Sequence, residues 1–150
     1  MTAWLRGDDK ANEALLLHEV ARLLRRRFEQ RTQVLGLTRS QWQALSVLRR
    51  APGLSQAELA DKLEVKPITL TRLLDRLEAA GWVRRAPDKT DRRVRRLFLT
   101  PRVEPVVRRM RAFGMETRRE ALRGFSQEEH KLLLKGLSKM KINLSGELGL

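Results

Sequence analysis

The segment from Ser55 to Leu99 constrains the fold of this chain more than any other part of the sequence. Ser55 is followed three residues later by Glu58, a capping box that marks the start of a helix. The stretch 64–66 leaves room only for a turn, and Pro67 suits the first position of a second helix. That helix has an apolar stripe at helical spacing, formed by Leu70, Leu73, Leu74 and Leu77. Two helices joined by a short turn predict a helix-turn-helix.

A β-hairpin is predicted directly after these helices. Gly81 suits a left-handed helix end, and β-compatible runs follow at 82–85 and 94–99, separated by the polar, turn-forming segment 86–93. From Arg84 to Arg96 the chain has seven basic residues against two acidic ones. An isolated basic turn is usually a solvated loop, but a narrow basic hairpin beside a helix-turn-helix fits the minor groove of DNA.

Helices are also predicted on both sides of this segment. Helical spacing of apolar residues predicts helices at 12–34, 38–51, 101–123 and 126–144, with capping boxes at Thr38 and Ser126 and a helix start at Thr100. The expected fold is mainly α (α+β), in the order α-α-α-α-β-β-α-α. We expect a winged helix-turn-helix lobe at 37–100, and a helical dimerisation lobe at 1–36 and 101–150, in one continuous structural unit. The apolar stripes of the outer helices favour packing against the same helices of a second chain.

Composition narrows the function classes. A net charge of +14 favours a polyanionic partner. The chain has no cysteine, so disulfides, thiolate metal sites and thiol redox sensing are excluded. No apolar run approaches the roughly 18 residues of a membrane span, and residues 1–10 lack the apolar core of a signal peptide. We therefore expect a cytoplasmic, nucleoid-associated bacterial protein with no membrane partner. No metal site, cofactor or catalytic motif is expected, and His18 and His130 are interpreted as surface or interface residues.

Candidate DNA contacts lie at two places in the segment. A helix-turn-helix places the N-terminal end of its second helix in the major groove, and arginine is well shaped to bridge guanine O6 and N7. Asp91 is interpreted as a carboxylate that orients the Arg93 guanidinium by accepting its hydrogen bond. The candidate DNA-binding residues are Ser55, Gln56, Lys66, Pro67, Thr69, Thr71, Arg72, Arg76, Lys89, Asp91, Arg92 and Arg93.

Several motifs of this chain, in order and at the right spacing, resemble the DNA-binding segment of the MarR family. They are 54–60 (LSQAELA), 69–81 (TLTRLLDRLEAAG), 91–93 (DRR) and 97–100 (LFLT). The resemblance extends from about Leu17 to Leu144 and is strongest to the SlyA-like branch, although Ile68 stands where relatives often have proline. It implies a winged-helix homodimer, with interlocked terminal helices, that binds double-stranded DNA at a pseudo-palindromic operator. It also implies that the arginine matching Arg93 enters the minor groove.

The same resemblance implies regulation. Many members release DNA when a small aromatic acid binds between the dimer helices and the DNA-binding lobe, and SlyA-like members also activate genes by displacing other DNA-bound proteins. The expected function is therefore a repressor or anti-silencer with a small aromatic carboxylate as effector. Trp42 and Arg22 are candidate effector contacts, although Trp42 also suits a core position and Arg22 a solvated face.

Two other functions remain open. A winged helix also serves as a protein-interaction module or as a non-specific nucleic-acid-binding module. Some methyltransferases carry a similar N-terminal winged helix as a dimerisation module. Because the chain ends in a capped helix of its own, we expect the methyltransferase alternative not to apply.

Overall fold

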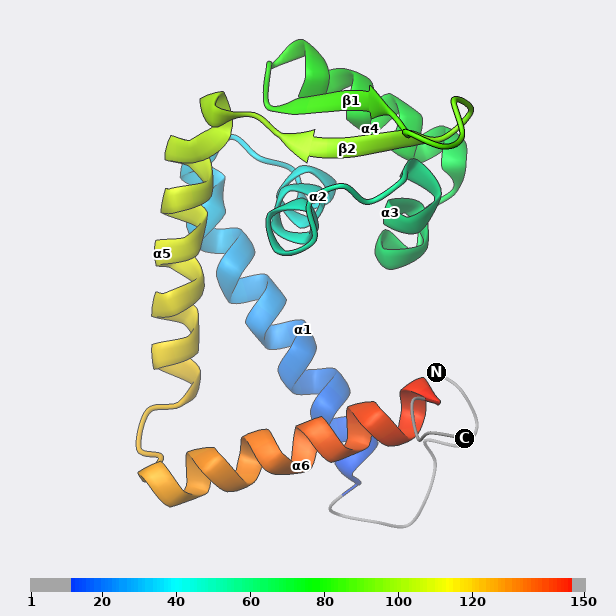
Figure 1. Cartoon of the computed structure of the whole chain (residues 1–150). Helices are drawn as coiled ribbons and strands as arrows, with labels where there is room; N and C mark the ends of the chain where they lie inside the picture. The colour runs from blue at the N-terminus through cyan, green and yellow to red at the C-terminus, as the bar shows by residue number, and fades with distance from the viewer. Residues whose placement is uncertain (1–11, 147–150) are drawn as a thin grey trace.

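The fold is mainly α, with one two-stranded antiparallel sheet, as the sequence predicts (Figure 1). The structure is a computed structural model that describes residues 12–146. Residues 1–11, on which the expectation about a signal peptide rests, and residues 147–150 lie outside the described part. The elements are α1 (Glu13–Thr32), η2 (Gln33–Leu35), α2 (Arg39–Arg50), α3 (Gln56–Leu63), α4 (Pro67–Ala79), β1 (Val83–Pro87), β2 (Arg95–Leu99), η3 (Pro101–Val103), α5 (Glu104–Ala121) and α6 (Gln127–Ser145).

The predicted local signals at the helix ends are confirmed. The capping boxes of Thr38, Ser55 and Ser126 are all formed, each with the side chain and backbone bonds reciprocated. Gly81 has φ 75° after α4, and the Trp82 N–H donates to the Leu77 carbonyl at 2.9 Å, a Schellman ending.

The helix start predicted at Thr100 is present, with Thr100 as the N-cap position of the 3₁₀ turn Pro101–Val103 that leads directly into α5. The Thr100 side chain does not cap this turn. Instead the Thr100 hydroxyl donates to the Gly81 carbonyl, and the Thr100 N–H donates to the Trp82 carbonyl. These bonds bind Thr100 to the segment leading into β1, so a short 3₁₀ turn precedes α5, which begins at Glu104.

We call residues 37–100 the winged lobe and the described residues outside them the helical lobe. In the winged lobe, α2, α3 and α4 pack around a core that β1 and β2 cover. The strands pair with Val83 opposite Leu99 and Pro87 opposite Arg95. The chain before α3 lies along the other edge of β2, because the Leu97 N–H donates to Leu54 and the Gly53 N–H donates to Leu97, both at 2.9 Å. Near Leu97, β2 therefore has backbone partners on both of its edges.

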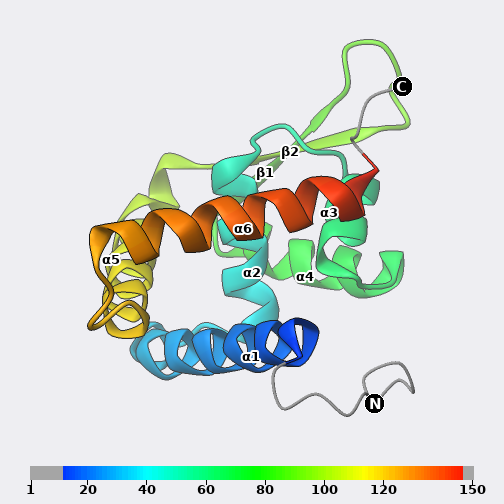
Figure 2. The same cartoon turned by 90° about the horizontal axis from the view of Figure 1, so that it is seen from below.

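The helical lobe is less enclosed. α1 packs against α5, and Val103, Val107 and Met110 extend the core of the winged lobe into the start of α5. α6 turns away from the end of α5 and projects from it (Figures 1 and 2), and none of its residues is buried. Among residues 12–146, no helix is long and apolar enough to cross a membrane.

Candidate nucleic-acid interface

The N-terminal end of α4 is open to solvent. Lys66, Pro67 and Thr69 are exposed, as are Arg72 and Arg76 further along the same helix. The opposite face is buried in the core through Leu70, Leu73, Leu74 and Leu77. Five of the candidate DNA contacts are therefore accessible at α4, and Thr69, Arg72 and Arg76 border one groove.

The backbone before α4 explains how this end is presented. Glu64 adopts a left-handed conformation with φ 53°, and the Val65 N–H donates to the Ala60 carbonyl at 3.1 Å, which turns the chain sharply after α3. The N-cap residue Lys66 makes no side-chain cap hydrogen bond within the described part of the chain. The N–H groups of the first turn of α4 are left for an outside acceptor, and the helix dipole makes that acceptor preferably anionic.

Two candidate residues near these helices form hydrogen bonds within the chain, and a third is half-buried. The Thr71 hydroxyl donates to the Pro67 carbonyl at 3.0 Å, one turn back in α4. The Ser55 hydroxyl accepts the Glu58 N–H at 3.1 Å as the cap of α3, and Gln56 is half-buried in the first turn of that helix. Thr71 and Ser55 therefore already have structural hydrogen bonds.

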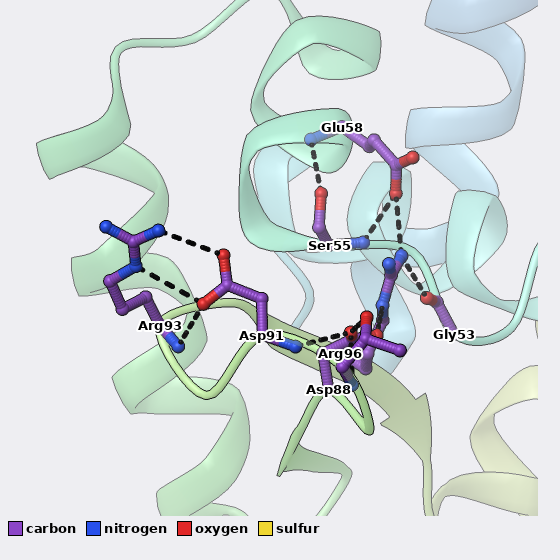
Figure 3. Close-up of polar contacts among 8 residues, drawn as sticks. Gly53, Ser55, Glu58, Asp88, Asp91, Arg93 and Arg96 are labelled. Atoms are coloured by element: carbon purple, nitrogen blue, oxygen red, sulfur yellow. Dashed lines mark hydrogen bonds and ion pairs between the residues drawn. The ribbon is translucent and has the colours of Figure 1, made fainter.

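At the tip of the hairpin, Asp91 contacts both the backbone and the side chain of Arg93. Asp91 accepts hydrogen bonds from the Arg93 backbone N–H at 3.0 Å and from its Nε at 3.3 Å (Figure 3). The Arg93 side chain is nevertheless 92% exposed. Lys89 and Arg92, the other basic candidates on this hairpin, are exposed beside it.

Behind the tip, the Asp88 carboxylate accepts four hydrogen bonds. Its Oδ2 accepts from the Thr90 hydroxyl at 2.6 Å, the Thr90 N–H at 3.0 Å and the Asp91 N–H at 3.1 Å. Its Oδ1 accepts from Arg96 Nε at 2.8 Å. The Thr90 hydroxyl, the Arg96 guanidinium and the two backbone N–H groups together lower the pKa of the Asp88 carboxyl far below its ordinary value. Asp88 is therefore an anion at every pH at which the protein would work.

The basic residues of the hairpin fall into two groups that the sequence does not distinguish. Arg85 is mostly buried and pairs with Asp75 of α4 at 2.8 Å, while its guanidinium donates to the Thr71 carbonyl at 3.3 Å. Arg96 pairs with Asp88 and Glu58. The other five, which include Arg84 stacked 4.8 Å above the Phe98 ring, are exposed: Arg84, Lys89, Arg92, Arg93 and Arg95.

A cavity of about 470 Å³ lies where α1, α2, α5 and α6 meet. Trp42 lines it, and the indole Nε1 of Trp42 is buried without an acceptor among the described residues. Arg25, Arg50 and Arg118 also line it, and no carboxylate of the described residues does. Arg22, the second ligand candidate, does not line this cavity and pairs with Glu19 at 3.7 Å on the surface of α1. Within residues 12–146, no cluster of His, Cys, Asp or Glu side chains is arranged to hold a metal ion.

Comparison with known proteins agrees with this geometry. Residues 35–94 match the family model described as MarR family. The crystal structure of a transcriptional regulator designated PA3341 has a TM-score of 0.80 and 32% sequence identity, covering 90% of this chain and 99% of that one. A MarR-family regulator from Silicibacter pomeroyi has a TM-score of 0.74 and 29% identity, covering 85% and 86%. The transcriptional regulator SlyA has a TM-score of 0.71 and 26% identity, covering 91% and 96%.

Proposed function

This chain belongs to the MarR family of DNA-binding transcription regulators, and from that premise we propose that it is a homodimer that recognises a pseudo-palindromic sequence in double-stranded DNA. Each chain would bind one half-site, with α4 in the major groove and the hairpin tip in the adjacent minor groove. Half-site centres would then lie about 34–36 Å apart along the duplex. We also propose that the protein acts in the bacterial cytoplasm, on the nucleoid.

The observation that carries this proposal is the pairing of an open helix end with an exposed arginine. The N-cap residue Lys66 makes no side-chain cap hydrogen bond within residues 12–146, and Lys66 and Thr69 are exposed to solvent. Arg93 projects from the hairpin, and Asp91 contacts its guanidinium. A buried face anchors α4, and Arg85 ties β1 to it. Helix end and wing are therefore set relative to one another, as reading two successive grooves requires.

The apolar surface of the helical lobe supports the homodimer. Among residues 12–146, fifteen large apolar residues are exposed, and all but Ile68 lie on α1, α5, α6 or the segments adjoining them. On α6 the apolar residues recur at helical spacing, and Leu133, Leu134, Leu137 and Met140 fall on one stripe. A second copy of the chain offers the same stripe, and a two-fold axis between copies would match a two-fold operator.

The test is titration of DNA that the wild-type protein selects from fragments of its source genome. We expect Arg93→Ala to weaken binding with little effect on unfolding, because the side chain is 92% exposed and contacts only the hairpin tip. Arg119→Ala is the matched control, since it removes an equal charge from the exposed surface of α5. Unchanged affinity of the Arg93 variant would refute the role of the wing.

Arg72→Ala distinguishes a base contact from a phosphate contact. If Arg72 contacts a base edge, the variant loses about 1–3 kcal/mol on the selected sequence and its sequence preference relaxes. An equal loss on all sequences would assign Arg72 to a phosphate.

The alternative is a protein-interaction or non-specific nucleic-acid-binding module. Competition between random DNA and the region upstream of the chain's own gene separates the two functions. Equal affinity for both DNAs would favour the alternative, whereas preference for one sequence supports the regulator.

We further propose that the regulator is SlyA-like, a repressor or anti-silencer, and that a small aromatic carboxylate binds the cavity between α1, α2, α5 and α6. Trp42, Arg50 and Arg118 line this cavity, and the two arginines supply positive charge for a carboxylate. Such an effector must favour one spacing of the two recognition helices over another in order to release DNA. Adding a benzoate-class acid to the protein–DNA complex tests this, since release must be lost in Trp42→Phe.

A further inference from the structure

We propose that Arg96 is a positioning residue: held between Asp88 and Glu58, it fixes the hairpin tip relative to α3 and so sets where Arg93 meets the DNA. This inference rests on the proposed function and concerns residues that contact the protein rather than the nucleic acid. It is carried by a continuous series of side-chain contacts that runs from the start of α3 to the Arg93 guanidinium (Figure 3).

The series begins at the first turn of α3. Glu58 Oε2 accepts the Ser55 N–H at 2.7 Å and also accepts from Arg96 at 3.4 Å. The same Arg96 nitrogen donates to the Gly53 carbonyl at 3.3 Å. Arg96 is therefore anchored to the backbone and side chain of the segment that opens the helix-turn-helix, 38 residues earlier in the chain.

The series continues into the tip through Asp88. Arg96 Nε donates to one Asp88 oxygen, and the other oxygen accepts from Thr90 and from the Asp91 N–H. The carboxylate thus organises the turn that carries Asp91. Asp91 in turn accepts from Arg93, so the pose of the wing arginine depends on a turn that Arg96 holds in place.

The hairpin needs such a support because it has only two strands. The paired strands end at Pro87 and Arg95, and beyond them one backbone hydrogen bond joins the Asp88 N–H to the Val94 carbonyl at 3.0 Å. A two-stranded ribbon by itself is marginally stable and strongly twisted. Ordering the tip before DNA arrives reduces the conformational entropy lost on binding, about 0.5–1.5 kcal/mol for each immobilised side chain.

The charges argue against a direct DNA contact by Arg96. Two carboxylates already surround its guanidinium, whereas a phosphate contact requires a free positive charge. Asp88 gives the sharper distinction. If Asp88 had no role in positioning Arg93, removing its negative charge close to the DNA polyanion would strengthen DNA binding. The positioning role predicts the opposite sign.

The experiment is a double-mutant cycle between Asp88→Asn and Arg93→Ala, titrated with DNA that the wild-type protein selects from a random-sequence pool. We expect Asp88→Asn to weaken binding about 3- to 10-fold, the range expected from the ordering cost of a side chain. We expect it to have no further effect once Arg93 is alanine, because the support acts through Arg93. Asp61→Asn is the matched control, since it removes the same charge from the exposed surface of α3 and must not weaken binding.

Arg96→Met is the second variant, which removes both ion pairs and keeps most of the apolar stem. Thermal unfolding of each variant shows that the winged lobe is intact, and Arg96→Met keeps the cycle decisive if Asp88→Asn does not fold. Equal or tighter binding by these variants overturns the inference, as does an equal loss in the Arg93→Ala background. Failure of the wild-type protein to select any sequence would instead refute the proposed function.

Discussion

The two lobes of this chain differ in how far they bury their apolar side chains. In the winged lobe the stripes of α2, α3 and α4 close on one core, and Ile68 is the one large apolar residue exposed among residues 37–100. In the helical lobe α1 and α6 keep large apolar side chains exposed, and α6 has no buried residue, whereas α5 buries Val107 and Met110 in the core. The first lobe is complete within one chain, and its surface is left for charged contacts. The second lobe leaves large apolar side chains exposed, and we propose that a second copy of the chain covers them.

The largest effect is expected from a charge placed in the apolar stripe of α6. Leu137 lies on the α6 stripe and is 37% exposed. Leu137→Lys would bury a charge in the proposed dimer interface, which is costly without a partner, so we expect a monomer. Because a monomer reads only one half-site, affinity for the selected operator should fall by roughly 10³-fold, toward the non-specific level. Sedimentation equilibrium and DNA titration measure the two effects.

Ser138 provides the matched control for that variant. It is the next residue of α6 and exposed, but it lies off the apolar stripe. Ser138→Lys adds the same charge and should leave the dimer and the DNA affinity unchanged. A dimeric Leu137→Lys protein would show that the α6 stripe does not form the interface.

The second prediction compares the two lobes directly in the monomeric Leu137→Lys background. Leu74 is fully buried in the winged lobe, whereas Leu134 of α6 is 51% exposed. Leu74→Ala should lower the free energy of unfolding by about 2–5 kcal/mol, because it leaves a cavity in a closed core. Leu134→Ala should change it by less than about 0.5 kcal/mol, as surface substitutions do. Urea unfolding monitored by circular dichroism measures both values.

Equal costs at the two positions would contradict this division of the molecule. They would mean that α6 packs within its own chain, and the homodimer would then lose its structural argument.

The contrast between the lobes also explains how much the sequence could predict. Helix starts at Thr38, Ser55 and Ser126 and the turn at Gly81 depend on residues within about three positions of each other, so local pattern is sufficient for them. The helix start at Thr100 was predicted as well, but its hydroxyl bonds to the Gly81 carbonyl, 19 residues away, and does not cap the turn that follows. A helix-cap signal cannot compete with a partner that only the folded hairpin supplies.

The same difference between local and distant contacts decides which parts of the candidate site the sequence could predict. Sequence alone supplies the positive charge of the hairpin and the Asp91–Arg93 pair, which are two residues apart. It does not separate Arg85 and Arg96 from the exposed basic residues. Arg85 pairs with Asp75 of α4, and Arg96 pairs with Asp88 of the hairpin and with Glu58 of α3; tertiary packing brings Asp75 and Glu58 to these arginines. Counting all seven basic residues as one DNA-facing tip therefore overestimates the charge that is free to meet phosphate.

The smallest expected effect concerns Ile68, the exception to the comparison. It is 59% exposed in the first turn of α4, between Pro67 and Thr69. If the surface of the winged lobe binds nucleic acid, the Ile68 side chain should contact an apolar group of the DNA. In the major groove that group is the thymine methyl. Replacing one thymine of each selected half-site by uracil, tested position by position, removes only that methyl. We expect a loss of about 4-fold per half-site at one position, from about 0.8 kcal/mol for a buried methyl-sized group.

Ile68→Ala tests whether Ile68 belongs to a DNA-binding surface or to a protein-binding surface. The variant should bind thymine and uracil operators equally, because it lacks the side chain proposed to contact the methyl group. It should remain a dimer, because Ile68 lies on α4 and not on the α6 stripe. If no thymine-to-uracil change affects the wild-type protein and Ile68→Ala alters the mass in solution instead, Ile68 belongs with the fourteen exposed apolar residues of the helical lobe. The winged lobe would then also contact protein, and the separation of the two surfaces would fail at the helix that is proposed to read DNA.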